Sequence, residues 1–172
     1  MKNLLVLTGI LLIANGCFKS SGIPYPAVTH NGTNIVAFKV NGKAVIVDGD
    51  ARSWGEGSYG ILFYDTDLVI ASHSEHPHYR IDIEQAVKNY PTITGSYTFT
   101  FNYPNAASFS DYTNGTIPSG DNTFVCDSTH SGYVSVEYFT KSVLSGTFAF
   151  DAVNSTGNVV HITEGRFDLS QP

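Results

Sequence analysis

Three histidines and a glutamate within one short segment form the densest group of potential metal ligands in the chain. They are His73, Glu75, His76 and His78. Neutral imidazole and carboxylate groups bind zinc or copper, so the segment is a candidate metal site. In an extended segment His76 and His78 face the same way, and a loop lets His73 or Glu75 turn towards them. The alternative is a solvated polar loop without any cofactor.

Four aromatic residues in segments rich in Gly, Ser and Asn form a second candidate site, for a ligand: Trp54, Tyr103, Phe109 and Tyr112. Aromatic rings on the loops of a β scaffold suit contact with sugars or peptides. The last three belong to residues 102–122, a polar stretch that predicts an unusually long loop. The other interpretation is that these rings fold back over the core.

Sequence patterns of the common catalytic sites are absent. The chain has neither the Gly-x-Ser-x-Gly nucleophile turn nor a phosphate-binding loop. Asp48-Gly49-Asp50 resembles half of a calcium loop but lacks the closing glutamate. Cys126 lies in an apolar stretch, which predicts a buried thiol that acts as a small hydrophobic residue. Enzyme activity is left open, and the balance favours a non-enzymatic protein.

Short alternating apolar and polar runs, separated by turns, must position these residues. Segments 36–40 and 43–47 flank Asn41-Gly42, which predicts a type I′ hairpin that pairs Phe38 with Val45. Segments 59–64 and 68–72 predict a second hairpin. Further strands are expected at 79–83, 97–101, 124–126, 133–139, 144–152 and 159–169, with one helical turn at 84–89. The pattern predicts an all-β fold, an antiparallel β-sandwich or barrel of about ten short strands in largely meander order.

The N-terminus has the pattern of an export signal. Lys2 precedes the apolar run 4–14, which is too short for the roughly 20 residues that span a bilayer, and Ala14-Asn15-Gly16-Cys17 follows. A cysteine directly after a small residue resembles the lipobox of bacterial lipoproteins. The resemblance implies removal of a signal peptide, residues 1–16, and attachment of acyl chains such as palmitate to Cys17. Two or three such chains anchor a protein firmly to a membrane.

The mature chain then divides into a lipid-attachment segment with a flexible tether, residues 17–34, and a single β-rich domain, residues 35–172. Loss of Lys2 from nine basic residues leaves eight, against fifteen acidic ones. No basic stripe is present, which argues against nucleic acid as a partner. The membrane contact is therefore expected through the acyl chains on Cys17 alone.

Three motifs extend the resemblance to lipoproteins over most of the mature chain: FKVNG at 38–42, SGTFAFDA at 145–152 and HITEGRFD at 161–168. Together they resemble a family of uncharacterised Gram-negative envelope lipoproteins. The resemblance implies a membrane-anchored envelope protein and brings no catalytic residue with it. Within the last motif, Arg166 and Asp168 are expected to form a weak surface pair.

The favoured function is that of a lipid-anchored, non-enzymatic β module that binds a ligand or a protein partner in the cell envelope. One alternative is a metal-binding or metal-dependent protein that uses His73, His76 and His78. Another is a structural component of an envelope assembly. Because no acidic run follows Cys17, the periplasmic side of the outer membrane is favoured over the cell surface.

Overall fold

The computed structural model describes residues 24–48, 59–64, 67–75, 78–86, 93–99, 105–114 and 119–170. They contain eleven strands: β1 Ile35–Val40, β2 Lys43–Asp48, β3 Tyr59–Tyr64, β4 Asp67–Glu75, β5 His78–Ala86, β6 Gly95–Thr98, β7 Ala106–Asp111, β8 Thr123–Val125, β9 Gly132–Phe139, β10 Val143–Val153 and β11 Val159–Ser170. No helix in the described parts is long and apolar enough to cross a membrane.

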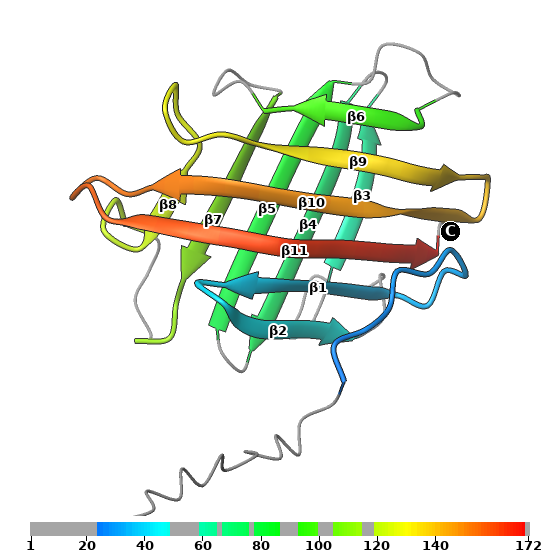
Figure 1. Ribbon diagram of the computed structural model, residues 1–172, viewed down its shortest axis with the longest axis horizontal. Helices are drawn as coiled ribbons and strands as arrows, with labels where there is room; N and C mark the ends of the chain where they lie inside the picture. The colour runs from blue at the N-terminus through cyan, green and yellow to red at the C-terminus, as the bar shows by residue number, and fades with distance from the viewer. Residues whose placement is uncertain are drawn as a thin grey trace, which may run out of the picture.

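All strands pair antiparallel and form one sheet that folds over on itself into two layers. In Figure 1, β2, β1, β11, β10, β9 and β6 make the front layer, and β3, β4, β5 and β7 cross behind it at a steep angle. The short strand β8 joins the layers, because it pairs with β7 over three residues and with β10 through Val125 and Val153 alone. The predicted all-β, antiparallel sandwich or barrel fold is confirmed.

The first hairpin has the register that its sequence predicts. Phe38 lies opposite Val45, and the two turn residues have positive φ angles, 48° at Asn41 and 84° at Gly42. A type I′ turn requires positive φ at both positions, which asparagine and glycine adopt most readily. The hairpin of β3 and β4 also forms as expected, with Phe63 opposite Leu68.

Phenylalanines of the front layer fill the core between the layers. The rings of Phe148 and Phe167 lie 6.5 Å apart, and the ring of Phe150 lies 6.1 Å from that of Phe99. Gly165 makes room for this packing, because a Cβ atom there would lie 2.5 Å from the Phe148 ring. The register between β10 and β11 shifts beside this glycine, as it does at a β-bulge.

Two expectations for single elements are wrong. Residues 106–111 lie inside the predicted loop 102–122 but form β7, an inner strand between β5 and β8. The predicted helical turn at 84–89 fails at its start, because Glu84 and Gln85 belong to β5 and pair with β4. In both places, hydrogen bonding to a neighbouring strand overrides local sequence preference.

The N-terminal strap, residues 24–34, is fixed along the outer face of the front layer. Its centre is held by Asp168 of β11, whose carboxylate accepts four hydrogen bonds: from Thr29 Oγ1 at 2.5 Å, Asn31 N at 3.1 Å, Gly32 N at 2.7 Å and Thr33 Oγ1 at 2.9 Å. This part of the expected flexible tether is thus attached to the domain.

Arg166 and Asp168 do not form the expected surface pair. Arg166 donates to the carbonyl oxygen of Pro26, and its guanidinium lies 4.3 Å from the centre of the Tyr25 ring. Asp168 is only 5% exposed beneath the strap. Both side chains therefore bind the strap, each at a different point.

Candidate functional site

The predicted metal ligands lie where β4 ends and β5 begins. The rings of His73 and His78 are 6.4 Å apart on the outer face of the back layer. Arg80 is the cross-strand partner of His73, so a positive charge shares this face. The side chain of Glu75 and the whole of His76 lie outside the described residues. Among the side chains that are described, no group of three potential ligands is close enough to hold a metal ion.

The predicted aromatic site is assembled only in part. Phe109 lies on β7 with 2% exposure, and its ring packs 5.0 Å from that of Tyr79 in the core, so it offers no exposed surface to a ligand. Tyr112 is half-buried, 6.4 Å from the ring of His73. Trp54 and Tyr103, like Cys17, lie outside the described residues. The prediction for Phe109 is wrong because the segment that carries it is a strand.

Two residues with nucleophilic side chains, Ser145 and Cys126, have structural roles. The Ser145 hydroxyl lies 2.6 Å from Nδ1 of His30, but Ser145 is completely buried beneath the strap and out of reach of a substrate. Cys126 is buried, as predicted, and burial raises the pKa of its thiol to about 11. A neutral thiol is a poor nucleophile at ordinary pH.

An apolar strip crosses β8, β10 and β11 on the outer face, and it consists of three valines. Val125 pairs with Val153 across strands, and Val153 pairs with Val159, so the three side chains stand side by side on the outer face. We call these residues the valine row. Val125 is 48% exposed and Val159 38% exposed. Strands that meet water usually present polar groups there, so this apolar row is unusual.

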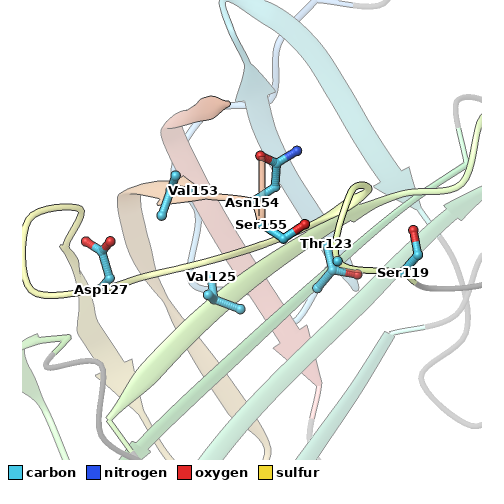
Figure 2. A pocket seen from close by; sticks show the side chains of 8 residues that line it. Ser119, Thr123, Val125, Asp127, Val153, Asn154 and Ser155 are labelled. Carbon is cyan, nitrogen blue, oxygen red and sulfur yellow. The ribbon is translucent and has the colours of Figure 1, made fainter. Parts of the chain in front are cut away.

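A groove of about 540 Å³ lies over the valine row (Figure 2). Its lining side chains come from β8, from the turn after β10 and from the loops that flank β8: Ser119, Gly120, Thr123, Val125, Asp127, Val153, Asn154 and Ser155. Figure 2 shows Asp127 at one end of this set and Ser119 at the other, with Val125 between them.

The wall at the Ser119 end is made of two turns that bind each other. Asn154 Nδ2 donates to the Asp121 carbonyl at 2.6 Å, and the Ser155 amide donates to the Gly120 carbonyl at 2.9 Å. Oδ1 of Asn154 accepts from the amides of Thr156 and Asn158. Most polar groups of this wall are therefore used within the protein.

The opposite wall carries the carboxylate of Asp127. Oδ1 of Asp127 accepts from the amides of Thr129 at 2.8 Å and His130 at 2.7 Å. These two hydrogen bonds hold the pKa of Asp127 well below its usual range, so the group is negatively charged at any physiological pH. On β10, Oδ1 of Asp151 lies 2.7 Å from Nδ1 of His161.

The strand directions place these charges on one side of the valine row. Asp127 lies two residues beyond Val125, the last residue of β8, and Asp151 precedes Val153 by two on β10. Because β8 and β10 run antiparallel, two residues forward from Val125 and two residues back from Val153 lie on the same side of the valine row. The groove thus has an apolar floor, one wall whose polar groups are hydrogen-bonded within the protein, and one wall that carries Asp127.

A second hollow of about 360 Å³ continues this surface beyond Val125. Small side chains of β7 form its floor, and Asp82 and Glu84 of β5 line its far side. Ser108 pairs with both Asp82 and Val125, so the surface extends without interruption from β5 to β11.

Comparison with protein-family models, with curated proteins and with solved structures finds no match to this chain.

Proposed function

We propose that this chain is a lipid-anchored envelope protein that binds a ligand or partner on the valine row and catalyses no reaction. The observation that carries the binding role is the row Val125–Val153–Val159, of which Val125 and Val153 line a groove of about 540 Å³. A contiguous apolar strip costs solubility, and on a soluble domain it commonly marks a contact surface. The anchor is supported by the lipobox-like sequence at Cys17.

The binding role is tested by titrating a fragment library into the acylated chain in nanodiscs, with valine methyl groups labelled for NMR. Ligands should shift the methyl signals of Val125, Val153 and Val159 together and in a saturable manner. Val125→Thr should weaken that response, because it puts a hydroxyl in the apolar floor. Val28→Thr is the matched control, since Val28 is similarly exposed, at 43%, but lies in the strap. If no fragment shifts the methyl signals of Val125, Val153 and Val159, the proposal is overturned.

The anchor is tested separately with Cys17→Ser. We expect the wild-type chain to incorporate labelled palmitate and to sediment with the outer membrane, and the variant to do neither. Sedimentation of the variant with membranes at the wild-type level would exclude acylation of Cys17 as the anchor.

One observation favours the metal-binding alternative, namely the 6.4 Å separation of the His73 and His78 rings. Imidazoles at this spacing can approach a shared ion by small side-chain rotations. Metal analysis after equilibration with zinc or copper should then show stoichiometric metal that is lost in His73→Ala and His78→Ala. His161→Ala, in an exposed histidine of the opposite layer, is the control. Equal metal content in all four proteins would reject this alternative.

A further inference from the structure

We infer that the groove binds an aliphatic chain that ends in a cation, an alkylammonium or guanidinium group, with the chain on the valine row and the cation at Asp127. The inference deepens the proposed binding function and rests on it. Such a group is present both in free diamines and in the side chains of lysine and arginine.

The apolar part of the ligand follows from what the groove leaves exposed. Its floor consists of valine side chains, and the amide of Asn154 and the backbone of Ser155 are already bound within the turns. A ligand rich in hydroxyl groups would find few free partners on that wall. An unbranched methylene chain instead gains from each apolar contact that it removes from water.

The cationic part follows from the acidic wall. The hydrogen bonds of Asp127 to Thr129 and His130 all go to Oδ1, so its other oxygen has no bonded partner among the described residues, and Asp127 lines the groove. No described lysine or arginine lines the groove. The imidazole of His130 is bonded to Asp127, and that of His161 is bonded to Asp151. The chain as a whole has a formal charge of −6, which also attracts cations.

The second hollow shows where a longer ligand would continue. It opens on the other side of Val125, and Asp82 and Glu84 line it. Asp82 is already paired with Arg80 at 2.7 Å. The cation of the ligand is therefore expected to bind Asp127. The second hollow gives room for a ligand that is longer than the groove.

The test compares cadaverine with 1,5-pentanediol, which has the same carbon chain but no charge. Each is titrated into the acylated chain in phosphatidylcholine nanodiscs, with the valine methyl signals as readout. Cadaverine should shift Val125 and Val153 in a saturable manner, and pentanediol should bind at least about fivefold more weakly, the factor expected from one exposed ion pair.

Asp127→Asn should weaken cadaverine binding by a similar factor of about five, because it removes the charge and keeps an oxygen for the turn. Glu137→Gln, the same change of charge at a site on β9 away from the groove, should leave it unchanged. Val125→Thr gives an independent variant should Asp127→Asn disturb the turn. Equal affinity for the diol, or cadaverine shifts that survive in both groove variants, would overturn the inference.

The outcomes also separate this inference from the proposed function. If cadaverine fails to shift the row while uncharged fragments still do so, the cationic ligand is refuted and the binding surface stands. If cadaverine binds, Nα-acetyl-lysine methylamide and its Nε-acetylated form identify the source. Tighter binding of the lysine derivative that is lost on Nε-acetylation points to a peptide, and tighter binding of cadaverine points to a free diamine.

Discussion

The carboxylate of Asp168 connects the first described residues of the chain to its last strand. It is 5% exposed and accepts hydrogen bonds from four donors of the strap. Asp168→Asn removes the charge and sets an amide group against those donors. We expect a loss of about 2–4 kcal/mol in the free energy of unfolding, measured by urea denaturation. Glu137→Gln, an exposed carboxylate, should change it by less than about 0.5 kcal/mol. Equal effects of the two substitutions would contradict this role.

The same residue makes stability depend on pH. Burial raises the pKa of Asp168, but the hydrogen bonds from Thr29, Gly32, Asn31 and Thr33 outweigh burial, and the folded-state pKa is lowered. The stabilisation is therefore complete above the unfolded pKa of about 3.9 and is lost as the pH falls through the lower folded value. In urea denaturation at a series of pH values, the gap between wild type and Asp168→Asn should be constant near neutrality and narrow below about pH 4. A gap that widens on acidification would contradict this sign.

Local sequence could not predict the role of Asp168. Its short distance from Arg166 in the sequence predicts a pair, whereas its partners lie about 135 residues earlier in the chain. The same holds for the valine row, because Val125 joins Val153 and Val159 only when β8 pairs with β10. Residues that depend on such pairing have no signal in any single stretch of sequence.

Strands with a strong local signal were predictable, and strands without one were not. Asn41-Gly42 and the alternation around it are enough to set the register of β1 and β2. The segment of β7, Ala-Ala-Ser-Phe-Ser-Asp, has one large apolar residue and resembles a loop. It is a strand because β5 and β8 bond to it on both sides. Phe109, which was predicted on a loop, therefore lies in the core.

The contact between β10 and β11 gives a test at the scale of elements. Gly165→Ala would place a Cβ atom 2.5 Å from the Phe148 ring, so we expect a loss of about 1–3 kcal/mol through overpacking. Phe148→Leu alone also destabilises, by leaving space in the core. The new Cβ atom would also lie 2.5 Å from the Phe148 carbonyl oxygen, a contact that leucine leaves in place, but the smaller leucine relieves the contact with the ring. The double variant should therefore lose less than the sum of the two. Strict additivity in denaturant titrations would show that the two residues do not share this space.

At the scale of the whole molecule, the strap decides how far the domain extends from its proposed anchor. With residues 24–34 attached to the front layer, only six residues, 18–23, lie between Cys17 and the strap, so Cys17 and residue 24 can be at most about 25 Å apart. A tether free as far as Asn34 would reach roughly 60 Å. With the proposed anchor on Cys17, the attached strap would therefore keep the start of the domain close to the bilayer.

This difference predicts a change in the distance between domain and bilayer. A donor dye on Ser142→Cys, in the exposed turn before β10, should transfer energy efficiently to acceptor lipids in nanodiscs that carry the acylated chain. Asp168→Asn loosens the strap, so transfer should fall as the tether lengthens, while Glu137→Gln should leave it unchanged. Limited proteolysis within 24–34 reports strap release independently. If proteolysis shows a released strap but transfer stays at the wild-type level, the strap does not set the distance, and the domain must contact the membrane by another surface.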